Sequence, residues 1–186
     1  MRKNWAALAL TGMLCLTTFA GIQTVSAETA DSAKQVDIVF THDTHSHLNT
    51  FTTIVDEAEK EVGGFARINT LIQEQKAKNP DTLVIDGGDF SMGTLIQTVF
   101  ETQAAEIRML GYMGCDVTTL GNHEFDYRSK GLANMLNSAA ESGDDLPAMV
   151  VCNVDWESME AAGLSEGQQL ILDMDEKQGV FDCFSY

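Results

Sequence analysis

Residues 117–126 read Val-Thr-Thr-Leu-Gly-Asn-His-Glu-Phe-Asp, a β-branched run that ends in a knot of polar side chains. Two earlier segments have the same form. Asp43 and His45 follow an apolar run that begins at Val36, and Gly-Gly-Asp at 87–89 follows Leu-Val-Ile. Parallel sheets bind their ligands beyond the carboxyl ends of the strands. These three polar segments, called the first, second and third knots in chain order, are therefore predicted to converge on one site.

Strands and helices are predicted to alternate along the chain. Apolar β-branched runs indicate strands, and apolar residues at three- and four-residue spacing indicate helices. The predicted strands are 36–41, 82–86, 116–120 and 148–153, and the predicted helices are about 65–76, 97–112 and 130–141. Residues 170–172 and 180–181 are predicted to begin a hairpin. This alternation predicts an α/β fold with a mainly parallel sheet.

The composition is that of a globular and strongly acidic protein. The 186 residues are enough for one domain with a core, and 44% of them are hydrophobic. The formal net charge of −17 provides no electrostatic footprint for a nucleic acid polymer, so that class of partner is excluded. A small anionic substrate would also be repelled unless a bound metal ion inverted the local field.

Residues 1–27 are predicted to be a secretory signal peptide, which leaves 28–186 as the mature chain. Two basic residues precede a mostly apolar segment, and Val25 and Ala27 supply the small side chains of a cleavage site. A membrane anchor is the alternative, although about 20 consecutive apolar residues are normally needed to span a bilayer. Signal removal would leave no stable membrane span, and the protein would be secreted, periplasmic or associated with a cell wall.

All four histidines lie in the first and third knots. Because alternate residues of a strand share a face, Asp43 and His45 are predicted to point to one metal ion. His47 would continue on the same side if the chain stays extended, and His42 would face away and have a structural role. A solvated cluster of histidines is the alternative for this segment.

Asp89 in the second knot and Asn122 in the third knot are the other candidate ligands. The glycines before Asp89 would let the backbone approach a metal ion while the carboxylate bridges two ions, although Gly-Gly is also a common turn signal. Asn122 would contribute its side-chain carbonyl oxygen, although asparagine is also common in turns and caps. This mixture of oxygen and imidazole donors suits Zn²⁺, Mn²⁺ or Fe²⁺ better than Ca²⁺ and indicates metal-assisted hydrolysis.

The order of these motifs resembles that of the calcineurin-like metallophosphoesterases, and the longer stretches are similar to the secreted 5′-nucleotidase branch of that family. The resemblance covers about residues 36–155. It rests on Thr-His-Asp-Thr-His-Ser-His at 41–47, Gly-Gly-Phe-Ala-Arg at 63–67, Gly-Gly-Asp-Phe at 87–90 and Leu-Gly-Asn-His-Glu-Phe-Asp at 120–126. It implies a metallophosphoesterase-type β-sandwich flanked by helices.

The resemblance also implies two divalent metal ions, such as Zn²⁺ or Mn²⁺, and the side chains around them. The implied ligands are Asp43 and His45 for the first ion, Asp89 for both ions and Asn122 for the second. His123 would be catalytic, since a cationic imidazole can meet the charge that develops on a phosphoryl group. Asp126 would orient that imidazole and keep it protonated.

The implied reaction is hydrolysis of nucleotide phosphoesters outside the cytoplasm by attack of a metal-bound hydroxide, with a small nucleotide as the partner. A non-catalytic metal-binding remnant is one alternative. Another is a hydrolase of the same fold that acts on cyclic nucleotides, nucleotide sugars or sulfur esters. Family members continue with three more metal-ligand histidines and a C-terminal nucleotide-binding domain, whereas no histidine follows His123 here. The chain is therefore expected to be an N-terminal part with little activity of its own.

Overall fold

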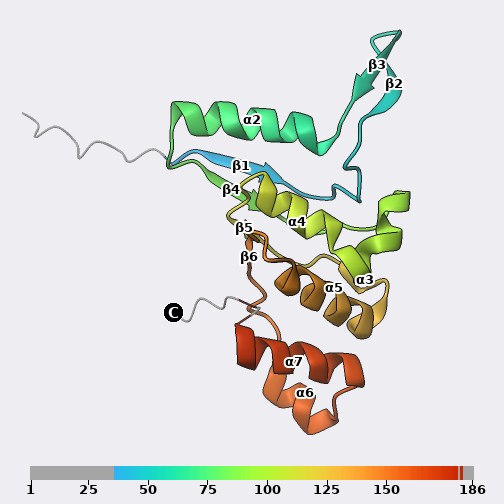
Figure 1. The fold of residues 1–186 in the computed structure, drawn as a ribbon, viewed down its shortest axis with the longest axis vertical. Coiled ribbons are helices and arrows are strands. Elements are labelled where there is room, and N and C mark those ends of the chain that lie inside the picture. Colours follow the sequence, from blue (N-terminus) through green and yellow to red (C-terminus); the bar gives the residue numbers. More distant parts are fainter. Residues whose placement is uncertain (1–35, 180, 182–186) are drawn as a thin grey trace, which may run out of the picture. The chain divides into compact units, whose positions relative to one another are not determined.

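The computed structural model describes residues 36–179 and 181, which form an α/β unit (Figure 1). Its main sheet is parallel, with strand order β1-β4-β5-β6. The strands are β1 (Ile38–Thr41), β4 (Leu83–Asp86), β5 (Val117–Thr118) and β6 (Ala148–Met149). The helices are α2 (Phe65–Lys78), α3 (Phe100–Gln103), α4 (Ala105–Tyr112), α5 (Arg128–Ser142), α6 (Trp156–Ala162) and α7 (Glu166–Gln178), with 3₁₀ turns η1 (Leu95–Val99) and η2 (His123–Phe125). The predicted α/β class, with a parallel sheet and flanking helices, is confirmed.

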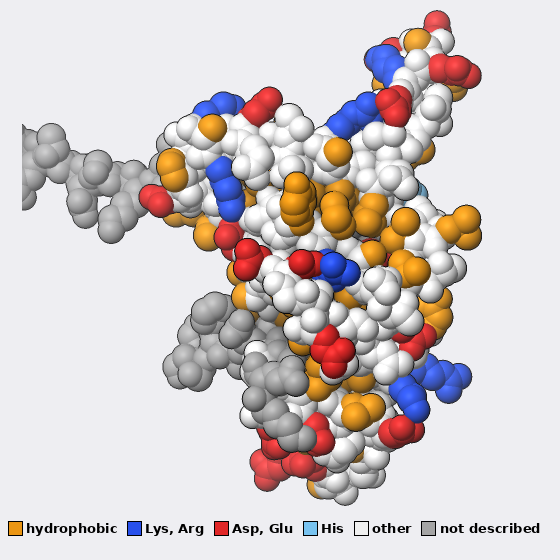
Figure 2. Space-filling model, in the orientation of Figure 1, with side chains coloured by type: hydrophobic (Ala, Val, Ile, Leu, Met, Phe, Trp, Pro, Cys, Tyr) orange, Lys and Arg blue, Asp and Glu red, His pale blue; other side chains and the backbone are white. Residues whose placement is uncertain are grey.

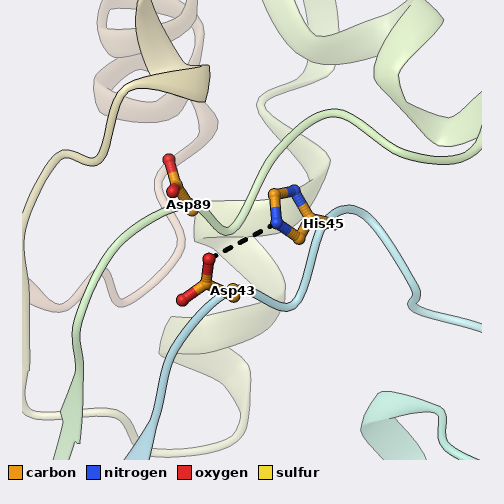
Figure 3. Close-up of side chains that lie close together, drawn as sticks. All are labelled: Asp43, His45 and Asp89. Atoms are coloured by element: carbon orange, nitrogen blue, oxygen red, sulfur yellow. Dashed lines mark ion pairs between the residues drawn. The ribbon is translucent and has the colours of Figure 1, made fainter.

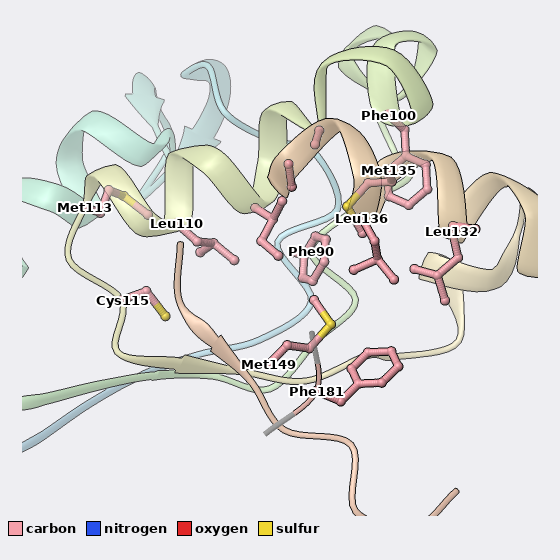
Figure 4. Close-up of a cluster of buried hydrophobic side chains, with 14 of the residues drawn as sticks. Phe90, Phe100, Leu110, Met113, Cys115, Leu132, Met135, Leu136, Met149 and Phe181 are labelled. Carbon is pink, nitrogen blue, oxygen red and sulfur yellow. The ribbon is translucent and has the colours of Figure 1, made fainter. Parts of the chain in front are cut away.

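One face of this sheet packs against the helices. Val84 and Met149 point into the core and are 1% and 3% exposed. Figure 4 shows the core where side chains from α3, α4 and α5 meet those that follow β4 and belong to β6. The buried side chains include Phe90, Phe100, Ile107, Leu110, Leu132, Met135 and Leu136. Burial of this apolar surface provides the main driving force for folding.

The other face of the sheet carries apolar side chains that stay exposed. Ile38, Phe40 and Leu83 are 56%, 59% and 42% exposed. The register pairs Ile38 with Leu83 and Phe40 with Ile85, so these side chains share one face. The described residues therefore cover only one side of the sheet.

The predicted helix 97–112 is wrong as a single element. The structure divides this segment into η1, α3 and α4, with Ala104 in the left-handed region at φ 48° and ψ 42°. Ala104 is fully buried. The turn at this residue lets Phe100 and Ile107 both reach the core, and that packing overrides the continuous helical pattern of the sequence.

The predicted hairpin at 170–172 is also wrong, because these residues lie within α7. Ser165 begins this helix with a capping box in which its side chain and that of Gln168 each bond the other's backbone. Of the second predicted arm, Phe181 is described and is buried, whereas residue 180 lies outside the described residues. The predicted signal peptide 1–27 lies outside them as well.

A hairpin that sequence analysis did not predict follows the first knot. Strands β2 (Phe51–Val55) and β3 (Ala58–Val62) pair antiparallel and extend from the rest of this unit in Figure 1. Asp56 and Glu57 form the turn with φ values of 53° and 63°. Such turns usually contain Asn-Gly or Asp-Gly, so Asp-Glu gave no hairpin signal. The predicted strands 116–120 and 148–153 are shortened to the two residues each of β5 and β6.

Charged side chains of both signs are interspersed on the surface. On the face shown in Figure 2, Lys and Arg side chains are scattered among Asp and Glu rather than gathered in one patch. Within the part of the chain that is described, no helix has the length and apolar character needed to cross a membrane.

Candidate metal centre

The first two knots lie side by side because their backbones continue to pair after the strands end. The backbone N–H groups of Asp43, His45 and Ser46 donate to the carbonyl oxygens of Gly88, Asp89 and Phe90 at 3.0, 3.1 and 2.8 Å. Asp43, His45 and Ser46 have φ values of 52°, 45° and 54°. The segment is therefore a tight turn rather than the extended strand that sequence analysis assumed, and it brings Asp43 and His45 together by a different route.

Asp43, His45 and Asp89 form a group that could hold a metal ion (Figure 3). One ligand atom from each lies within 4.8 Å of the others. Nε2 of His45 is 3.5 Å from Oδ1 of Asp43. The Nδ1–H group of His45 donates to the carbonyl oxygen of Met92 at 3.0 Å, which leaves the lone pair of Nε2 facing the two carboxylates. Carboxylate and imidazole donors in this arrangement fit a divalent transition metal.

The third knot meets this group at Asp89. The N–H group of His123 donates to Oδ1 of Asp89 at 2.9 Å. A Cβ atom on Gly121 would lie only 2.1 Å from the same oxygen, so the close approach requires glycine. The Asn122 amide lies 3.3 Å from Oδ2 of Asp89 and 3.3 Å from the nitrogen of His123. In one orientation its nitrogen donates to Asp89, and in the other its oxygen faces Asp89 as a second ligand of one cation would.

His123 and Asp126 form the pair that sequence analysis predicted. Nδ1 of His123 is 2.9 Å from Oδ2 of Asp126. This hydrogen bond raises the pKa of the imidazole above its ordinary value. The His123 ring also packs edge-on against the ring of His45, with 4.9 Å between the centroids. The imidazole therefore lies beside the Asp43, His45 and Asp89 group without belonging to it.

The other two histidines occupy places that differ from the prediction. His42 does not face away, because its Nδ1 contacts Oδ2 of Asp43, and this hydrogen bond lowers the pKa of the Asp43 carboxyl group. His47 does not continue on the side of His45. Its Nδ1 lies 3.1 Å from the carbonyl oxygen of Thr44, and its ring packs against Phe51. The tight turn causes both differences.

Glu124 is a residue whose role sequence analysis missed. It is fully buried and accepts hydrogen bonds from the N–H groups of Asp89, Ser91 and Gly121 at 3.0, 3.0 and 2.7 Å. The Ser91 hydroxyl donates to it at 2.7 Å. One carboxylate thus ties the second knot to the third. Nothing in the sequence distinguishes Glu124 from the neighbouring polar residues of the third knot.

Asp86 has a similar role at the end of β4. Burial raises the pKa of its carboxyl group. Oδ2 accepts from the Thr41 hydroxyl at 2.7 Å, and Oδ1 accepts from the Gly88 N–H group at 3.0 Å and the Thr118 hydroxyl at 3.1 Å. Asp86 therefore joins the ends of β1, β4 and β5 beneath the ligand group.

Comparison with known proteins places this arrangement among phosphoesterases. The 5′-nucleotidase of Mus musculus is 36% identical over 110 residues, which are 58% of this chain and 19% of that protein. The crystal structure of a 5′-nucleotidase precursor from Thermus thermophilus superposes with a TM-score of 0.56 at 31% identity and covers 64% of this chain and 22% of that one. The structure of Haemophilus influenzae NAD nucleotidase gives 0.54 at 27% identity and covers 63% and 20%.

The matches cover most of this chain but only a small part of each relative. The chain spans about a fifth of the length of the curated relatives that it matches. Residues 36–175 match the sequence model described as calcineurin-like phosphoesterase, and this segment contains all three knots. The protein therefore belongs to the calcineurin-like phosphoesterase family.

Proposed function

We propose that the protein contributes the metal-binding part of a nucleotide phosphoester hydrolase that works outside the cytoplasm. The observation that carries this proposal is the convergence of Asp43, His45 and Asp89 beside the His123–Asp126 pair. The relatives named as nucleotidases support a small nucleotide as the substrate. The signal-like pattern of residues 1–27 supports export.

Two divalent ions would be held by four side chains. Asp43 and His45 would hold one ion, Asn122 the other, and Asp89 both. Among the described residues, no Lys or Arg side chain forms an ion pair with Asp43 or Asp89, so both carboxylates can serve a metal ion. Bound metals would provide an activated water and neutralise the phosphoryl charge. The protonated His123, oriented by Asp126, would donate hydrogen bonds to phosphoryl oxygens as charge develops on them.

Metal titration tests the proposal directly. The chain would be freed of metal with a chelator and titrated with Mn²⁺ by calorimetry. We expect one tight site and one weaker site, because the second ion has only Asp89 and Asn122 as proposed ligands. Phosphate release from AMP, although low, should depend on Mn²⁺ and disappear in Asp89→Ala. Absence of Mn²⁺ binding, or binding that Asp89→Ala leaves unchanged, would refute the proposal.

A further inference from the structure

Glu106, on α4, is a buried carboxylate that touches the His45 loop but has no part in the proposed chemistry. It is fully buried, and its Oε1 accepts a hydrogen bond from the Ser46 hydroxyl at 2.7 Å. Its Oε2 has no hydrogen-bond partner among the residues that the structure describes. A buried carboxyl group with one unsatisfied oxygen costs stability. A functional role of Glu106 would explain why the protein carries a carboxyl group at this buried position.

Ser46 is the point through which Glu106 reaches the metal centre. Ser46 follows His45 directly, is fully buried and has φ 54°, in the left-handed region. Its N–H group donates to the Phe90 carbonyl oxygen at 2.8 Å, and its own carbonyl oxygen accepts from the Thr94 hydroxyl at 2.7 Å. These two bonds tie it to the loop after β4. The bond to Glu106 is the third tie and the one that reaches a helix of the core.

We propose that Glu106 is a positioning residue for the metal centre, which acts through Ser46 to keep the His45 side chain turned toward Asp43 and Asp89. The inference rests on the proposed function, since it takes His45 as a metal ligand. A left-handed serine is held only where its surroundings determine it. Loss of the Glu106 acceptor would leave the buried Ser46 hydroxyl unpaired, and the turn could relax away from the ligand geometry.

The expected loss of Mn²⁺ affinity on removal of Glu106 follows from the behaviour of other metal sites. Removal of a group that orients a metal ligand typically weakens metal binding by about 10–100-fold. Glu106→Met keeps the volume and removes the acceptor, so Mn²⁺ affinity should fall by about 10-fold or more. Glu106→Gln keeps an acceptor for Ser46, so its Mn²⁺ affinity should stay within about two-fold of the parent chain. Retained Mn²⁺ affinity in Glu106→Gln would show that the acceptor for Ser46, and not the negative charge of Glu106, supports metal binding.

The test is Mn²⁺ titration of the full chain and its variants by calorimetry, with folding checked by circular dichroism. Ser46→Ala should weaken binding as much as Glu106→Met does. The double variant should lose little more than either single variant, because both remove the same hydrogen bond. Ser138→Ala is the matched control. It removes a serine hydrogen bond of 2.8 Å to the Glu101 carbonyl oxygen, between α5 and α3, and should leave Mn²⁺ affinity unchanged.

The outcomes separate this inference from the proposed function. A parent chain that binds no Mn²⁺ would refute the proposed function, and this inference with it. Binding by the parent that Ser46→Ala leaves unchanged would overturn the positioning role alone, even if Glu106→Met does not fold. A fully additive double variant, or a Glu106→Gln variant as weak as Glu106→Met, would overturn it as well.

Discussion

Replacement of Glu124 by glutamine should destabilise the fold although it exchanges only one heavy atom. The carboxylate accepts four hydrogen bonds, two on each oxygen. An amide nitrogen in place of Oε2 would face the N–H groups of Asp89 and Gly121, and both would lose their acceptor. In place of Oε1 it would face the Ser91 N–H group, although the Ser91 hydroxyl could turn and accept. The better orientation thus leaves one buried backbone donor unpaired, at a cost of about 1–3 kcal/mol.

A smaller effect opposes this loss. Glu124 contributes to raising the pKa of Asp86 and of Glu106, so removal of its charge relieves some repulsion. Burial is the main cause of both shifts, and the lost hydrogen bond should therefore dominate. A net loss of about 2 kcal/mol corresponds to a fall in Tm of about 4–8 °C for a chain of this size.

Circular dichroism recorded during heating measures this change in Tm. A chelator is present so that bound metal does not contribute to stability. Glu101→Gln is the matched control, because Glu101 accepts a hydrogen bond at 2.8 Å from the exposed side chain of Asn134 and its variant should change little. If Glu124→Gln and Glu101→Gln melt at the same temperature as the parent, Glu124 does not tie the two loops together in the way described.

Three further changes test other parts of the structure. Arg128→Gly should stabilise the fold by about 1 kcal/mol in urea unfolding, since Arg128 begins α5 with φ 59° and glycine tolerates that region; an unchanged or lower midpoint would contradict this. Asp89→Ala should weaken Mn²⁺ binding more than Asp43→Ala, and equal losses in calorimetry would remove the argument for a bridging carboxylate. His123→Asn should keep the metal content, measured by elemental analysis, while phosphate release falls by about 10²–10⁴-fold; loss of metal would make His123 a ligand.

Much of the site was predictable because it depends on the ends of parallel strands. Runs of β-branched residues located the strands, and parallel topology required their carboxyl ends to meet. The proximity of the segment that carries Asp43 and His45 to Asp89 follows from this rule. The backbone conformation that brings Asp43 and His45 together differs from the prediction, however, because residues in the left-handed region after Thr41 replace the expected strand. Periodicity carries no signal for such a turn when the residues are not glycine.

Features that depend on tertiary contacts could not be predicted from the sequence. The break at Ala104 exists because Phe100 and Ile107 must both reach the core, and local propensity does not contain that requirement. The β2–β3 hairpin lacks the usual glycine turn. The partners of Glu124 and Glu106 are backbone and hydroxyl groups that are distant in sequence. Only the folded arrangement shows which donors point at them.

The open face of the sheet should govern how the protein behaves in solution. Ile38, Phe40 and Leu83 present apolar surface to solvent, and contact between such surfaces weakens on cooling and strengthens in sulfate or phosphate salts. The net charge of −17 opposes association, and added salt screens it. The protein should therefore stay dispersed in cold buffers of low ionic strength and cluster reversibly on warming or on addition of ammonium sulfate, which light scattering would follow.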